Sequence, residues 1–210
     1  GYVYMANAEN NWKFASQPNW DGPNYGAGST PGVLNSDPGA GNFKVPAGYY
    51  KLNVNAAVDP MTYTAIATVW GVMGDYNGWS SQTDMIYNPA TQTFSLALHL
   101  TSGGGFKFRG TSDWSVNYGS KAANGILDTE NDNNIPVTIT GDYALTMDLS
   151  HPKEYTYSAY TWGVIGDATA GGWSSDQNMT WDAVKKVFTV TLDLTAGTFK
   201  YRANDDWAMA

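Results

Sequence analysis

Basic residues gather in three short segments of a chain that is otherwise acidic. The 210 residues carry 11 Lys and Arg against 19 Asp and Glu, for a formal net charge of −8. Five of the basic residues lie in similar segments that alternate aromatic with basic residues: Lys13, Lys107, Arg109, Lys200 and Arg202. Because successive side chains of a strand point to opposite faces, Phe106 and Phe108 should share one face and Lys107 and Arg109 the other. The cationic face can then donate hydrogen bonds to a polar ligand.

Tryptophan recurs at two positions of the same pattern. One position follows each basic segment and the other follows a glycine farther upstream: Trp20, Trp114 and Trp207 at the first, Trp79 and Trp173 at the second. Asn-Tyr-Gly comes next after Trp20 and Trp114, beginning at Asn24 and Asn117. Flat sugar faces pack on aromatic rings, and sugar hydroxyls need donors and acceptors beside the ring. Trp, Lys or Arg, and Asn together suit a shallow carbohydrate platform.

Some of these aromatic residues suit a buried core instead. We expect six of them to be core residues of strands: Trp70, Trp162, Phe106, Phe108, Phe199 and Tyr201. For Trp79 and Trp173, an exposed platform and a core hinge both stay open. Platform is favoured for Trp114 and Trp207, because their neighbours are small and polar. Repetition does not decide between the two, since fold-defining residues repeat as faithfully as binding ones.

Catalytic chemistry has little support in the sequence. The two histidines, His99 and His151, fall at non-equivalent places, and there is no G-x-S-x-G, H-E-x-x-H or phosphate-loop motif. Carboxylates are plentiful, but none stands among apolar neighbours that would raise its pKa, as a glycosidase acid requires. Asp113 and Asp206 each precede a repeated tryptophan, which favours a turn or capping role. We therefore expect no catalytic residue and no cofactor.

Metal and nucleic-acid binding are also disfavoured. The absence of cysteine excludes thiolate zinc sites and disulfides. The segment 128–132 places oxygen ligands at alternate positions, as calcium loops do, but it lacks the following glycine and the distal glutamate. A solvated hairpin tip is the favoured interpretation over a calcium site, and no metal site is expected. A net charge of −8 argues against a phosphate backbone as ligand.

One sequence unit is written more than once along the chain. The segment beginning WGVMGDYNGWSS at Trp70 returns as WGVIGDATAGGWSS at Trp162, 92 residues later. The segment beginning at Trp12 matches the one beginning at Phe106. A repeat of this length is the size of a domain. We therefore expect the second half of a module in 1–67, a complete module in 68–159 and the first half of a module in 160–210, here called the first, second and third repeats. Two interpretations stay open: the chain is a fragment of a longer array, or the two half-modules complete each other as one permuted module.

Period-two alternation predicts strands throughout. Phe94, Leu96, Leu98 and Leu100 alternate with polar or small residues, and the segment 188–194 repeats the pattern. Turn residues separate the strands and no stretch has a helical period. The fold class predicted is all-β, with tandem immunoglobulin-like antiparallel β-sandwich modules. There is no signal peptide and no apolar run of the roughly 18 residues that span a bilayer, so a mature or excised piece is expected.

The order of the motifs resembles a known family. The G-D-x-x-G-W turn, the F-K-F/Y strand, the D-W…N-Y-G loop and the closing G-Y-Y-K-L or G-D-Y-A-L strand together resemble the starch-binding outer-membrane lipoproteins of the SusE and SusF type. The resemblance implies carbohydrate-binding modules, without catalysis, on the extracellular face of a bacterial outer membrane. The lipidated cysteine of that family is absent from these residues, so the resemblance leads us to expect a lipid anchor outside this chain.

By motif position the resemblance assigns ligand contacts in each repeat. They are Trp79, Lys107, Arg109, Trp114 and Asn117 in the second repeat, Trp173, Lys200, Arg202 and Trp207 in the third, and Trp12, Lys13, Trp20 and Asn24 in the first. The expected partner is a polysaccharide, by default starch or maltooligosaccharide, with other glycan-uptake outer-membrane proteins as further partners and no nucleic acid. The alternative function is a structural or protein-interaction spacer in a surface glycan-uptake complex.

Overall fold

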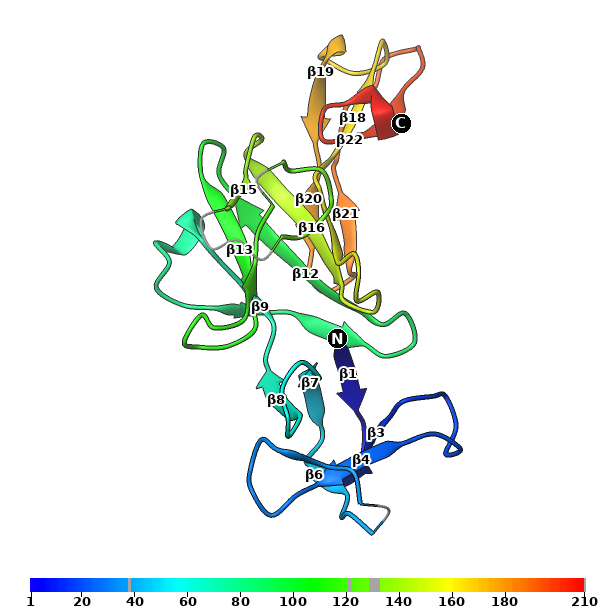
Figure 1. Ribbon diagram of the computed structural model, residues 1–210. Helices are drawn as coiled ribbons and strands as arrows, with labels where there is room; N and C mark the ends of the chain where they lie inside the picture. Colours follow the sequence, from blue (N-terminus) through cyan, green and yellow to red (C-terminus); the bar gives the residue numbers. More distant parts are fainter. Residues whose placement is uncertain (38, 121, 129–132, 210) are drawn as a thin grey trace. The chain divides into compact units, whose positions relative to one another are not determined.

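The computed structural model describes residues 1–37, 39–120, 122–128 and 133–209, and it confirms an all-β protein (Figure 1). Within these residues every strand pairing is antiparallel, and the only helical elements are two short 3-10 turns, η1 (Asp75–Asn77) and η2 (Trp207–Met209). No helix in the described ranges is long and apolar enough to cross a membrane. The chain forms two compact units, Gly1–Val69 and Trp70–Ala210. The expected repeat boundaries at 67 and 159 stay predictions.

The N-terminal unit consists of three small sheets. One places β7 (Gly48–Asn55) between β1 (Tyr2–Met5) and β8 (Thr62–Thr68). The other pairings are β2 (Asn10–Trp12) with β6 (Phe43–Val45), and β3 (Phe14–Ala15) with β4 (Asn24–Ala27) and then β5 (Leu34–Asn35). Aromatic rings fill the space between the sheets: Trp12, Phe14, Phe43 and Tyr63 contact one another.

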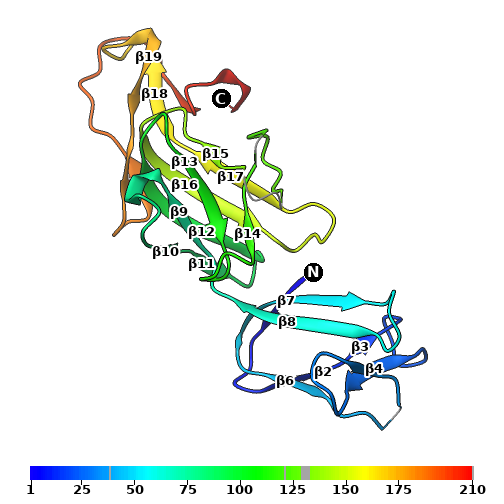
Figure 2. The ribbon, with the colours of Figure 1, turned by 60° about the vertical axis from the view of Figure 1, so that its left-hand side comes forward.

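The second repeat is a sandwich of two sheets. The first sheet has the order β10 (Thr83–Asp84), β9 (Gly71–Gly74), β13 (Gly105–Arg109) and β14 (Asn117–Tyr118), and β15 (Ile135–Pro136) also pairs with β13. The second has the order β11 (Ile86–Asn88), β12 (Thr93–Leu100), β16 (Gly141–Asp148) and β17 (Thr156–Tyr160). Both sheets can be followed in Figure 2.

Large apolar side chains from both sheets fill the sandwich. Phe106 and Phe108 of β13 are fully buried, as the alternation predicts, and the Phe108 ring lies 6.0 Å from that of Tyr157 on the opposite sheet. Trp70 is also buried, as predicted. The prediction for β12 is confirmed only in part, because Phe94 and Leu100 are buried whereas Leu96 and Leu98 are half-buried.

The third repeat forms a smaller arrangement. Here β18 (Trp162–Gly166) lies between β19 (Gly172–Asn178) and β22 (Lys200–Ala203), and β20 (Thr180–Asp182) pairs with β21 (Val187–Thr189). Asp142 of β16 ties this repeat to the second. One of its carboxylate oxygens contacts His99 Nδ1 at 2.7 Å and the other accepts a hydrogen bond from Trp181 N at 2.8 Å.

Three predictions for the third repeat are wrong. The strand expected over 188–194 ends at Thr189, and the expected core residues Phe199 and Tyr201 are largely exposed. Trp162, also expected in the core, is only half-buried. The reason is the missing partner: β12 is paired along its whole length by β16, whereas no described strand pairs with residues 190–194. Alternation favours a strand, but a ladder of hydrogen bonds needs a neighbour to complete it.

Candidate ligand-binding site

The outer face of one sheet in the second repeat carries the predicted polar residues. Arg109 of β13 pairs with Asn117 of β14, so the two side chains share a face, and Lys107 lies two residues back on that same face. The opposite face holds the buried Phe106 and Phe108. The prediction that Lys107 and Arg109 share one face of the strand, opposite Phe106 and Phe108, is therefore confirmed.

Two tryptophans stand over this face. Trp79 follows η1, and Trp114 lies in the loop between β13 and β14. Both are half-buried, and their ring centroids are 6.0 Å apart at an interplanar angle of 44°. With residues of the sheet they border a groove of about 600 Å³, which is lined by Trp79, Lys107, Asp113, Trp114, Ser115, Asn117 and Asn134. Lys107 lies deep in it and is only 4% exposed.

The orientation of Trp79 is fixed by a carboxylate. Asp75 Oδ1 accepts a hydrogen bond from Trp79 Nε1 at 2.8 Å, and its other oxygen accepts one from the backbone N–H of Gly105 at 2.7 Å. One side chain thus links the tryptophan ring to β13. The Trp79 N–H itself donates to the Gly74 carbonyl.

The backbone at both tryptophans is in the left-handed region. The φ angle is 60° at Trp79 and 63° at Trp114, where a bulky residue is rare. Such conformations cost on the order of 1 kcal/mol or more and concentrate at functional sites. Asn117 Nδ2 donates to the Trp114 carbonyl at 2.7 Å and holds the loop in place.

Arg109 lies against Trp114. Its guanidinium carbon is 5.1 Å from the centroid of the Trp114 ring, and its Nε donates to Gln82 Oε1 at 2.8 Å. Arg109 does not line the groove. Its position therefore suits a residue that orients the Trp114 ring and polarises it by a cation–π contact.

Asp113 fastens the loop that carries Trp114. Its carboxylate accepts hydrogen bonds from the hydroxyls of Thr111 and Ser115 and from the Ser115 N–H, which lowers its pKa from 3.8 to about 2. Because the pKa is lower in the folded protein, the contribution to stability is complete above the ordinary pKa and is lost as the pH falls through about 2. The turn role predicted for Asp113 is confirmed.

A titration tests this fastening. We expect the Asp113 carboxyl to titrate by NMR with a midpoint near pH 2, and the Trp114 indole signal to stay unchanged from pH 8 to about pH 4. Asp113→Asn serves as the control, because it keeps the shape and removes the charge. A midpoint near 4 would show that the loop bonds do not favour the carboxylate.

The third repeat reproduces most of this arrangement. The rings of Trp173 and Trp207 are 6.0 Å apart at 37°, and Arg202 lies 4.7 Å and Lys200 5.7 Å from the centroid of the Trp207 ring. Arg202 is tied to Asp176 by a buried ion pair. The hydrogen bond to Asp176 is the main cause that raises the pKa of Arg202 further. The four predicted residues are therefore brought together here too.

The first repeat does not assemble its four predicted residues in this way. Trp12 packs against Phe14 and Phe43 at centroid distances of 5.0 and 4.6 Å, within the aromatic core of the unit. Trp20 is 70% exposed, and Ala15 stands where the other repeats have arginine. Lys13 and Asn24 are half-buried.

The sequence pattern did not indicate two groove residues and one residue beside the groove. Ser115 and Asn134 line the groove beside Asp113, and Gln82 bonds to Arg109. The Trp-Ser-Ser sequence that precedes Gln82 is repeated before Asp176, which was the available signal. Nothing in the local pattern around Asn134 points to the groove.

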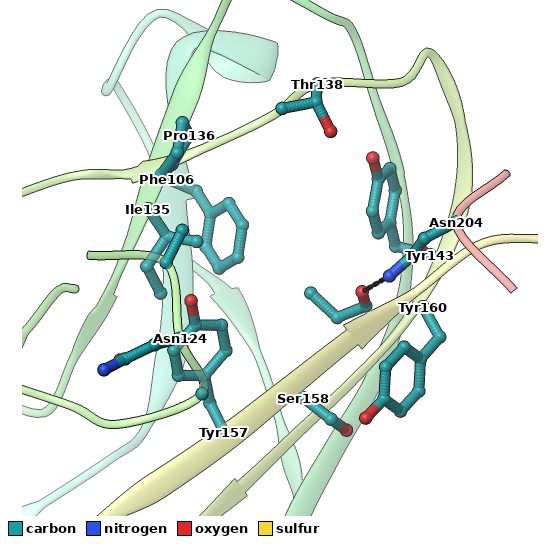
Figure 3. Close-up of a pocket in the computed structure, with 13 residues that line it drawn as sticks. Phe106, Asn124, Ile135, Pro136, Thr138, Tyr143, Tyr157, Ser158, Tyr160 and Asn204 are labelled. Carbon is teal, nitrogen blue, oxygen red and sulfur yellow. Dashed lines mark hydrogen bonds between the residues drawn. The ribbon is translucent and has the colours of Figure 1, made fainter. Parts of the chain in front are cut away.

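A second recess opens between the two sheets of the sandwich. It holds about 470 Å³ and is bordered by the aromatic residues Phe106, Tyr143, Tyr157 and Tyr160 (Figure 3). Two of its polar side chains are bonded within the chain: Tyr143 Oη donates to the Ile139 carbonyl at 2.9 Å and Asn204 Nδ2 to the Ala159 carbonyl at 3.1 Å. We therefore place the candidate site in the groove.

Metal ligands do not cluster in the part of the chain that the structure describes. Of the acidic segment weighed as a calcium loop, residues 129–132 lie outside the described residues. The groove presents aromatic faces, a lysine, a carboxylate, amides and a hydroxyl, which can bind a polar ligand with flat apolar faces.

Comparison with known proteins gives one structural likeness. No protein-family model and no curated protein match the chain. Among solved structures, the chain is similar to SusF from Bacteroides thetaiotaomicron, with a TM-score of 0.35 and 14% sequence identity over 87% of this chain and 48% of that chain. The chain thus spans about half the length of that structure. At this TM-score the likeness assigns no ligand and no residue role.

Proposed function

We propose that this chain binds polysaccharide without cleaving it, with the groove of the second repeat as its main site. The observation that carries the proposal is the pair of half-buried tryptophans, Trp79 and Trp114, standing over Lys107 and Asn117. Sugar rings would pack on the indole faces, and their hydroxyls would bond to the lysine and the amides. An α-glucan such as starch is the first ligand to test, following the motif resemblance.

The same resemblance supports a place at the cell surface. We propose display on the extracellular face of a bacterial outer membrane, beside other glycan-uptake proteins. A shallow site gains little once ordering costs are met, so each site should bind weakly by itself. The Trp173–Trp207 pair offers a second site on the same chain, and two sites gain through effective concentration.

Affinity electrophoresis tests the proposal. We expect gels that contain soluble starch to retard the chain, and a panel of other glucans to rank its preference. Assays of reducing sugar should show no release above background. Unretarded migration on every glycan would favour the alternative function, a structural spacer, whereas release of reducing sugar would make the protein an enzyme.

A further inference from the structure

The arginine beside the platform tryptophan has a different partner in the two repeats. Arg109 donates through Nε to the neutral amide of Gln82 at 2.8 Å. Arg202 donates to the carboxylate of Asp176, through Nε at 3.0 Å and also through Nη2. Gln82 and Asp176 hold equivalent positions, because each directly follows a Trp-Ser-Ser sequence. At this matched position the two repeats therefore differ in charge.

The second repeat has its carboxylate two residues farther along. Gln82 Nε2 donates to Asp84 Oδ1 at 2.8 Å, and Asp84 is exposed to solvent. The third repeat has Asn178 at the position of Asp84. At these two positions amide and carboxylate thus stand in reversed order, so the positions differ in where the negative charge lies and not in its amount.

The position of the carboxylate decides how much of the arginine's charge reaches the ligand. The Asp176 side chain is 2% exposed and contacts the guanidinium directly, so it cancels the charge of Arg202 locally. Asp205 and Asp206 also act electrostatically on Arg202. In the second repeat, water screens the exposed Asp84, and an amide separates it from Arg109. The ionised Asp113 lines the groove, but Asp206 holds the matching position before Trp207, so this carboxylate does not distinguish the two repeats. The field of Arg109, which bonds to a neutral amide, therefore adds to that of Lys107 at the groove.

We propose that Gln82 and Asp176 set the charge preference of the two sites: the groove of the second repeat accepts glycans that carry carboxylate or sulfate groups, and the Trp173–Trp207 platform disfavours them. This inference rests on the proposed function, since it specifies the ligand of the same sites. Complementary charge acts on a ligand substituent even without direct contact, whereas a neutral sugar is insensitive to it.

Isosteric substitutions test the proposal. The probes are soluble starch and its carboxymethyl derivative, which share a backbone and differ in charge. In the Trp207→Ala background, which isolates the second repeat, we expect Gln82→Glu to weaken binding of carboxymethyl starch by about threefold to tenfold and binding of starch by less than about twofold. The difference should shrink in 0.5 M NaCl, a salt concentration at which screening is strong.

The reverse change is made in the third repeat. In the Trp114→Ala background, Asp176→Asn should strengthen binding of carboxymethyl starch relative to starch. The control for Gln82→Glu is Gln92→Glu, which adds the same charge on the exposed turn between β11 and β12. An unchanged ratio of the two affinities in Gln82→Glu, with starch still bound, would overturn this inference alone. Failure of the parent chain to bind any glycan would instead overturn the proposed function.

Discussion

Trp114→Ala is expected to lower the affinity for maltoheptaose by about tenfold to a hundredfold, since an aromatic contact of this kind contributes about 1–3 kcal/mol and each 1.4 kcal/mol is a factor of ten. The physical reason is its place in the groove. One part of the indole borders the groove beside Trp79, and Arg109 packs against the ring. Calorimetric titration of parent and variant in the Trp207→Ala background measures the effect.

Stability controls separate binding from folding in this experiment. Trp114 is half-buried and its backbone is left-handed, so the loss of its side chain should cost little stability. Glycine tolerates that backbone better than alanine does, and Trp114→Gly should therefore be more stable than Trp114→Ala by about 1 kcal/mol. Trp181→Ala, a half-buried tryptophan outside the groove, should leave binding unchanged. A Trp114→Ala protein that folds normally and binds as tightly as the parent would remove Trp114 from the site.

The sequence was sufficient for the parts of the fold that depend on local pattern. The alternation of apolar and polar residues predicted the strand β12 and the two faces of β13, because the side-chain period of a strand is fixed by its backbone. The repeat then indicated which tryptophans occupy equivalent positions, and the structure shows that Trp79 and Trp114 lie together, as do Trp173 and Trp207.

Local sequence pattern could not predict the features that depend on residues far apart in the sequence. The exposure of Phe199 and Tyr201 follows from the absence of a partner for 190–194 among the described strands. The hydrogen bond between Arg109 and Gln82 joins residues that are 27 positions apart in the sequence. With this bond, Arg109 lies beside the Trp114 ring and does not line the groove. Trp12 was assigned to a platform by its motif position, yet its motif equivalent is Phe106, a core residue. Burial depends on the sheet that covers a residue, which a single strand's sequence does not specify.

Trp70→Ala is expected to have the largest effect on stability, a loss of about 3–5 kcal/mol in the free energy of unfolding, as for other large-to-small changes in a core. Trp70 is 1% exposed, and its ring stacks on Tyr118 at 5.5 Å and 14° and lies 6.4 Å from Phe94 of the other sheet. Gly110 lies so close that a β-carbon there would be 2.9 Å from the indole, so the ring is tightly packed. Denaturant unfolding followed by circular dichroism measures the loss, and Trp70→Phe, which keeps an aromatic ring, should lose less. Tyr118 directly follows the groove residue Asn117 on β14. We expect the affinity for the ligand to fall only to the extent that the Trp70→Ala protein unfolds. A midpoint within the error of the parent's would show that Trp70 does not support the core, and would leave the stacking of Tyr118 without a role in the fold.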